Sequence, residues 1–480
     1  MLSSVDDLEC LSREELIGRI RELEQGGAQM DEARAKTSKS SPRKRKKANR
    51  PFDFAKSIKS DFFGGDAIES CLVRYGRRYV ALKLAYLGWD YRGFASQTVD
   101  DTVEVMNDLQ TDVFARHFLF LLQAHLFAAL LKVRLIESRA TCRYSRCGRT
   151  DKGVSALGQV ISLCVRSNLT DGPGIIPPSD SKSSPEKGSR IPIELDYVRL
   201  LNKALPKDIR IMAWSPVPSH FDARFSCLSR TYKYFFPRTN LNIELMNSAA
   251  QKFVGEHDFR NFCKMDIGGG VTNFVRRILY VDLQCIENKS MQLESFQLCA
   301  FTVCGQAFLW HQIRCMIAVL ILIGLGLEKP EVIDHMLDVR ACPGKPQYSM
   351  ASEHSLLFYD CAFEDLKWIC DADTHEEILT HFQDVWAGKE IRSAMLREIV
   401  DSATSCLVAN KDAPNDFTRW SDMGRSVYGQ LDSYIPGLVR GSSYRSILDR
   451  PSADTLEERL ASQQAKRARL EGLGSESTSL

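Results

Sequence analysis

Short segments in which apolar and polar residues alternate recur along this chain, and they constrain its fold more than any other feature. Residues 78–87 place Val80, Leu82, Leu84 and Tyr86 on one face, which is the period of a half-buried strand. Two halves that each mix such strands with helices indicate an α+β fold with antiparallel sheets. Further strands are predicted over 159–165, 210–214, 231–236, 274–285 and 296–303, and helices over 126–136, 195–204, 246–254 and 316–325.

The 480 residues are enough for two or three domains. Ser12 and Glu15 form a capping box for a short first helix. The basic run within Lys36–Arg50 is typical of a nuclear-import signal, an auxiliary RNA contact or a solvated linker. Residues 168–190, rich in Pro, Gly and Ser, are predicted to form a surface insertion. We expect an N-terminal helix and basic linker over 1–74, a first half over 75–220, a second half over 221–370 and a partly disordered extension over 371–480.

Composition limits the classes of function. The formal net charge is only +2, so nucleic-acid affinity must come from local clusters of cations. None of the 15 cysteines has Cys-x-x-Cys spacing, which makes a zinc site weakly signalled. With a polar, acidic N-terminus, reduced cysteines in an intracellular protein fit best. The longest apolar run, Cys315–Leu327, is shorter than the ~20 residues of a membrane span and predicts a buried helix.

The loop Cys147–Ala156 carries a candidate reactive group. Asp151 stands between Arg149 and Lys152, and Gly148 and Gly153 flank the three. Neighbouring positive charge favours an ionised carboxylate at neutral pH, and the same cations can bind phosphates. The loop is therefore either a site for carboxylate chemistry on an anionic polymer or a plain surface turn between two strands.

The amino-acid sequence of this loop resembles the signature of the TruA-type tRNA pseudouridine synthases, and Asp151 matches their catalytic aspartate. Residues 86–97, 221–234 and 305–314 resemble the other family motifs in the family order, and the match extends from about Tyr79 to Trp368. The resemblance implies two ferredoxin-like (RRM-like) halves whose antiparallel sheets form one central cleft. Three segments resemble the eukaryotic branch of the family that modifies positions 38 and 39 of tRNA: residues 261–266, 347–351 and 359–361.

The resemblance also implies roles for individual residues. Asp151 either attacks C1′ of the ribose or removes a ribose proton. Tyr232 packs on the target uracil, Arg314 pairs with the aspartate, and Arg149 enters the stack as the base leaves. The reaction oxidises nothing and adds nothing, so neither a metal nor a cofactor is expected. The remaining expected phosphate contacts are Arg143, Arg146, Lys152, Arg224, Arg230 and Lys233.

The expected partner is the anticodon stem-loop of tRNA, with the protein in nucleus and cytoplasm and no membrane contact; a homodimer is left open. Alternatives are a branch with broader tRNA specificity and a catalytically silent tRNA-binding protein. A carboxylate hydrolase is disfavoured because no partner carboxylate or metal cluster accompanies Asp151. His257-Asp258 is interpreted as structural. Val105–His125 departs from the family pattern, either as a genuine insertion or as a translated intron.

Overall fold

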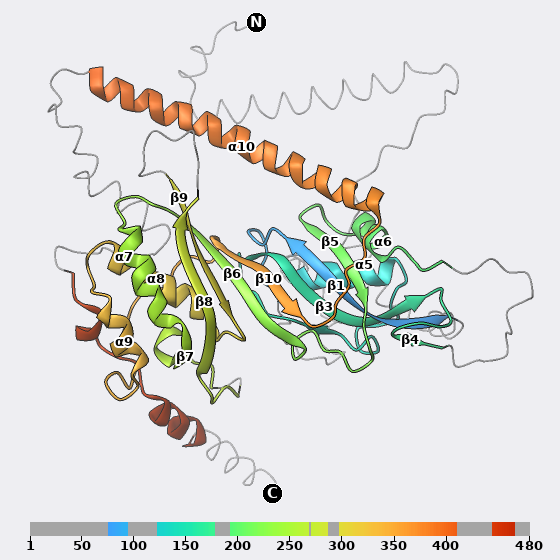
Figure 1. Ribbon diagram of the computed structural model, residues 1–480, viewed down its shortest axis with the longest axis horizontal. Helices are drawn as coiled ribbons and strands as arrows, with labels where there is room; N and C mark the ends of the chain where they lie inside the picture. Colours follow the sequence, from blue (N-terminus) through green and yellow to red (C-terminus); the bar gives the residue numbers. More distant parts are fainter. Residues whose placement is uncertain are drawn as a thin grey trace, which may run out of the picture. The chain divides into compact units, whose positions relative to one another are not determined.

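A ten-stranded sheet runs through both halves of the part of the chain that the structure describes (Figure 1). The computed structural model describes residues 75–94, 122–177, 193–267, 270–286, 297–409 and 444–465. Helices are interspersed with the strands, which confirms the predicted α+β class. The strands are β1 (Gly76–Tyr86), β2 (Ser145–Arg146), β3 (Ser155–Ser167), β4 (Ile175–Ile176), β5 (Ile209–Pro216), β6 (Cys227–Pro237), β7 (Gly255–Asp258), β8 (Val275–Cys285), β9 (Leu298–Gly305) and β10 (Leu356–Phe363).

The strand order shows how the two halves are joined. In the first half, β1 pairs antiparallel with β3, β4 and β5. In the second half, β6 pairs antiparallel with β9 and β10, and β8 continues the sheet to β7. The two halves meet where β10 runs parallel to β3, with Leu357 opposite Ser155 and Phe358 opposite Ala156. This joint lies directly after the loop that carries Asp151, so one sheet fixes that loop relative to both halves.

The helices begin and end close to their predicted positions. α5 begins four residues earlier than the predicted 126 and ends at Lys132, because Arg134 adopts a left-handed conformation (φ 55°) that the helix cannot continue through. Asp196 caps α6 by accepting a hydrogen bond from the backbone N–H of Arg199 at 2.9 Å. The helices are α5 (Leu122–Lys132), α6 (Tyr197–Ala204), α7 (Ile243–Ala250), α8 (Gln312–Gly324), α9 (Glu331–Leu337) and α10 (Ala372–Ala409), with 3₁₀ turns at Gln251–Phe253, Arg260–Phe262 and Ile447–Asp449.

Helix α8 is buried along its whole length, which confirms the burial predicted for the apolar run from Cys315. It lies beside α7 in the second half (Figure 1). The close approach depends on Gly324, because a Cβ there would stand 2.4 Å from the sulfur of Met246. Within the described residues, no helix is both long and apolar enough to cross a bilayer.

The C-terminal part contains a long helix that the sequence pattern did not predict. α10 has 38 residues, and many of its apolar side chains face solvent, including Trp386 at 66% exposure. Residues 444–465 dock on the second half through Glu328, which accepts hydrogen bonds from the Tyr444 hydroxyl and the Ile447 backbone N–H, both at 2.6 Å. The predictions for residues 1–74, 105–121 and 178–190, and those for residues 410–443 and 466–480 of the C-terminal extension, lie outside the described residues.

Candidate active site

The loop that carries Asp151 joins β2 to β3 and is fixed by hydrogen bonds on both sides of that residue. The fully buried Gln159 accepts from the backbone N–H of Gly148 at 3.3 Å and donates to its carbonyl at 2.8 Å. The carbonyl of Thr150 accepts from the backbone N–H of Phe94 at 3.0 Å. The backbone around Asp151 is therefore held to β3 and to the segment after β1, as a rigid catalytic group requires.

The carboxylate of Asp151 is contacted by the residues that lead into α8. The indole N–H of Trp310 donates to Oδ1 at 3.1 Å, and Nε2 of His311 lies 3.3 Å from Oδ2. The side chain keeps 29% of its surface exposed. Burial raises the pKa of Asp151 above its ordinary value, and Glu353 adds to the rise, whereas Arg314 and the Trp310 hydrogen bond oppose it. The sequence predicted only the effect of the cations, but burial has the larger influence.

His311 contacts the carboxylate of Asp151 as an uncharged group, because its imidazole is neutral at physiological pH. Burial above all, together with the positive charges of Arg314, Lys264 and Lys345, lowers the pKa of His311 to about 4. Its backbone is left-handed (φ 62°), a strained conformation for a residue other than glycine that is often found at functional sites. This geometry turns the imidazole toward Asp151 at the point where α8 begins.

Arg314 lies one turn into α8 and acts on Asp151 without touching it. Its guanidinium forms an ion pair with Glu353 at 2.8 Å and donates to the carbonyl of Ala351 at 2.6 Å. Its positive charge nevertheless lowers the pKa of Asp151. The direct pairing implied by the family resemblance therefore differs from this geometry, because Glu353 competes for the same guanidinium.

Tyr232 on β6 lies against the other side of the loop. Its ring stacks on Phe358 of β10 at 4.8 Å between centroids and meets the edge of Phe308 at 5.2 Å. A Cβ built on Gly148 would lie 3.7 Å from the hydroxyl oxygen, so the hydroxyl faces the loop. Burial above all raises the pKa of Tyr232, and Asp151 contributes to the rise, so the hydroxyl stays protonated at neutral pH.

Asp151, Tyr232 and Arg314 thus come together from a loop of the first half and from a strand and a helix of the second. Trp310, His311, Glu353 and Phe358 belong to the same arrangement, although no role was predicted for them. Trp310 and His311 lie inside the motif at 305–314, which was the available signal. Glu353 and Phe358 contact the site through pairing over long sequence distances, for which no local signal exists.

The predicted phosphate contacts fall into two groups. Arg149 and Lys152, on either side of Asp151, have exposed side chains, as do Arg143 and Arg224. Arg146 is half-buried and donates to the side-chain oxygen of Gln123 at 2.9 Å. Arg149, Lys152 and Arg224 remain available to an anionic ligand near the loop, whereas Arg143 lies over the ring of Tyr79 and donates to the carbonyl of Ser219 at 3.1 Å.

Arg230 and Lys233 do not lie where the predicted phosphate contacts would place them. Arg230 is only 9% exposed and donates to the carbonyls of Gln306 and Arg224 at 2.6 Å each and of Cys147 at 3.1 Å. These contacts give it a structural position in place of a phosphate contact. Lys233 stacks on Tyr359 at 4.1 Å, and strand alternation places it on the face of β6 opposite Tyr232.

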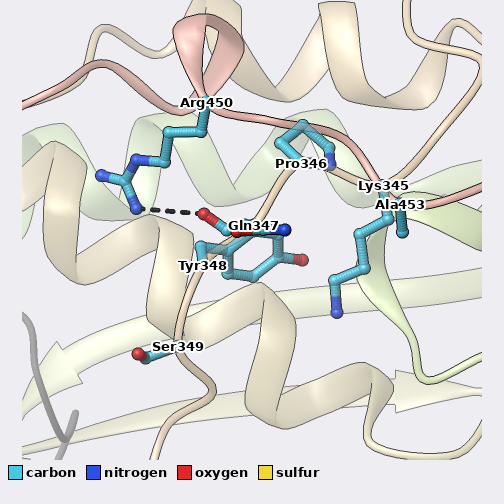
Figure 2. A pocket seen from close by; sticks show the side chains of 7 residues that line it. All are labelled: Lys345, Pro346, Gln347, Tyr348, Ser349, Arg450 and Ala453. Carbon is cyan, nitrogen blue, oxygen red and sulfur yellow. Dashed lines mark hydrogen bonds between the residues drawn. The ribbon is translucent and has the colours of Figure 1, made fainter.

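A cavity of about 410 Å³ lies elsewhere in the second half, where the C-terminal segment meets the chain after α9. Figure 2 shows its lining, in which Arg450 donates to the carbonyl of Gln347 at 3.4 Å. Its lining includes neither Asp151 nor Tyr232 nor Arg314. We therefore take the arrangement around Asp151, and not this cavity, as the candidate active site. The cavity is lined by Lys345, Pro346, Gln347, Tyr348, Ser349, Arg450 and Ala453.

Comparisons with known proteins identify the family of this chain. A family model described as tRNA pseudouridine synthase matches residues 249–364. The tRNA pseudouridine(38/39) synthase of Homo sapiens is 43% identical over 458 residues, covering 93% of this chain and 86% of that protein. The chain therefore belongs to the tRNA pseudouridine synthase family, as its motifs predicted.

Further relatives narrow the group within the family. The protein of Bos taurus is 42% identical over 466 residues, covering 95% of this chain and 88% of its own. That of Saccharomyces cerevisiae is 40% identical over 370 residues, covering 74% and 72%. Both are tRNA pseudouridine(38/39) synthases, which agrees with the predicted branch.

Proposed function

We propose that this protein isomerises uridine to pseudouridine at positions 38 and 39 of tRNA, with Asp151 as the catalytic group. The relatives that match most of the chain support the substrate and the positions. The observation that carries the catalytic assignment is the placement of Asp151: it is partly exposed and within reach of Trp310 and His311, under the charge of Arg314. Glu353, the other carboxylate of this arrangement, is paired with Arg314 at 2.8 Å, so Asp151 is the one that can present an anionic oxygen to a ribose.

The reaction breaks the bond between C1′ and N1 of the uracil and forms a bond between C1′ and C5. N1 gains a proton and C5 loses one, so atoms and charge balance without an oxidant or a second substrate. Asp151 acts either by attack of a carboxylate oxygen on C1′ or by removal of a ribose proton. Both routes need an ionised carboxylate, which Arg314 and the Trp310 hydrogen bond favour and burial opposes. Because Trp310 and His311 occupy both oxygens in the free protein, the ribose must displace or share one of these contacts.

The residues around Asp151 can assist base flipping, hold the freed uracil and bind the phosphates of the tRNA. The base must leave the stack to reach the carboxylate. Arg149, exposed two residues before Asp151, is placed to fill the vacated position, where its planar guanidinium can stack and also bind a phosphate. Tyr232, held against Phe358, presents a protonated hydroxyl that can hold the freed uracil or assist the proton transfer at C5. Lys152 and Arg224 then serve as phosphate contacts on the anticodon stem-loop.

The test uses unmodified tRNA transcripts that carry uridine at positions 38 and 39, incubated with the purified protein. We expect pseudouridine at these two positions and none in transcripts with cytidine there. Pseudouridine at several distant positions would favour the broader-specificity branch. Tight binding without any pseudouridine would favour a silent tRNA-binding protein and contradict the proposal.

Where the protein acts in the cell is a separate proposal. The basic run at residues 42–47 suggests import into the nucleus as well as presence in the cytoplasm. A fluorescent fusion that lacks this run should shift toward the cytoplasm, and an unchanged distribution would contradict the idea. A homodimer is one option for the assembled enzyme, and sedimentation of the purified protein tests it.

A further inference from the structure

Three cysteines from separate parts of the chain converge beside the candidate active site. Cys147 precedes the Asp151 loop, Cys227 begins β6 and Cys361 lies on β10. Their three sulfur atoms all lie within 4.8 Å of one another. Cys147 and Cys227 are buried and Cys361 is half-buried. Within the described residues, this is the one group of three or more Cys, His, Asp or Glu side chains that closes to metal-binding distance.

The cluster lies beside a buried cation that forms no ion pair with any other residue of the described ranges. Arg230 is 9% exposed, and none of the ion pairs between described residues involves it. Its guanidinium donates to the carbonyl of Cys147 at 3.1 Å and reaches that of Cys227 at 3.5 Å. A buried charge without a counter-charge is costly. A negatively charged group beside Arg230 would offset the free-energy cost of burying its charge.

We propose that Cys147, Cys227 and Cys361 bind a zinc ion as thiolates. At a Zn–S distance of about 2.3 Å, tetrahedral geometry separates the sulfur atoms by about 3.8 Å, so small side-chain rotations close the cluster around an ion. Binding releases three protons, one from each thiol, and leaves the zinc and three thiolates with one net negative charge. Arg230 neutralises that charge. The group contains no fourth side-chain ligand among the described residues, so a water molecule would take the fourth position, as at zinc sites with three protein ligands.

The ion has a structural task in this position. Cys147 is four residues before Asp151, Cys227 is five residues before Tyr232, and Cys361 follows Phe358 on β10. A zinc ion would tie together the loop and the two strands that carry these groups. It would not take part in the isomerisation, which needs no metal.

A disulfide is the competing chemistry for such a cluster. It would join two of the sulfur atoms with loss of two electrons to an external oxidant, leaving the third thiol unused and Arg230 without an anion. Zinc uses all three sulfur atoms and supplies the missing charge, and the geometry therefore favours the metal.

The experiment measures zinc in the full-length protein, purified without chelator, by elemental analysis. We expect a single zinc ion per chain, lost in Cys227→Ser and Cys361→Ser and retained in the control Cys370→Ser, whose thiol is also half-buried but lies outside the cluster. Zinc-free protein reconstituted with cobalt should show thiolate-to-cobalt charge-transfer absorption.

Two further readouts keep the proposal testable if a serine variant does not fold. In the wild type, a chelator should lower the melting temperature, and added zinc should protect three thiols from a thiol reagent. Absence of zinc binding in the purified and zinc-supplemented protein would overturn the proposal. So would zinc that persists in Cys227→Ser, or a disulfide between two of these cysteines found by mass spectrometry.

Discussion

Replacing Arg230 by methionine should destabilise the protein and leave the salt dependence of tRNA binding unchanged. In the sequence, Arg230 resembles the other cations that flank the candidate site, and a phosphate contact was the prediction. In the structure it is buried and bonded to backbone carbonyls. Arg149 is the matched comparison, because it is an arginine near the same site with an exposed side chain.

The expected loss follows from the contacts. Arg230 makes three close hydrogen bonds of 2.6, 2.6 and 3.1 Å to the carbonyls of Gln306, Arg224 and Cys147, and a longer one of 3.5 Å to that of Cys227. A hydrogen bond to a charged group contributes about 1.5–3 kcal/mol net. Methionine refills most of the volume and removes a buried charge, which recovers part of that sum. We therefore expect the free energy of unfolding to fall by about 3 kcal/mol, or the melting temperature by roughly 4–6 °C for a folded chain of this size.

Two assays separate the alternatives. Thermal melts measure stability, and tRNA affinity measured at several salt concentrations gives the slope of log K against log[salt]. Arg149→Met should melt like the wild type and reduce the steepness of that slope by about 0.8, the loss of one phosphate contact. An Arg230→Met protein that melts like the wild type but shows the reduced slope would refute the buried, structural position of Arg230.

Three further predictions concern the groups around the carboxylate. In Trp310→Phe, the N–H that lowers the pKa of Asp151 is lost, so the acid limb of the pH–rate profile should move to higher pH; an unmoved limb would contradict the contact. The pKa of His311 is about 4 in the folded protein and ~6.5 when unfolded, so protonation favours unfolding. Its contribution to stability is complete above pH ~6.5 and is lost as the pH falls toward 4, so urea midpoints at pH 7 and pH 5 should differ less in His311→Gln than in the wild type. Phe358→Ala removes a fully buried ring that stacks on Tyr232, and should cost about 3–5 kcal/mol in urea unfolding, whereas a loss under 1 kcal/mol would show that the site collapses around the change.

Local patterns predicted much of this fold because they depend on neighbours in the sequence. Alternation located β1, β6 and β8 to within a few residues, and the apolar run located α8. The loop motifs identified Asp151, and their order around it predicted that the two halves meet there. These features need only the period of a strand or helix and the turn residues between them.

The remaining features depend on pairing between distant segments. Arg230 and Lys233 lie in one basic and aromatic stretch, yet strand alternation gives one a buried site and the other a place on the opposite face. The sequence does not show which face of β6 is covered, because Phe358 of β10 and the Asp151 loop provide that cover. The ion pair between Arg314 and Glu353 could not be predicted for the same reason, because it joins two segments that are distant in the sequence. α10 was missed because its exposed apolar side chains weaken the amphipathic period.

The most direct test of the account compares Asp151→Asn with the wild type on one tRNA, by mapping pseudouridine at positions 38 and 39 and measuring affinity in the same samples. The substitution keeps the shape of the side chain and removes its charge and its nucleophilic oxygen. The account predicts tRNA binding close to that of the wild type and no pseudouridine at either position. Pseudouridine formed at the wild-type rate would contradict the claim that this carboxylate carries the chemistry.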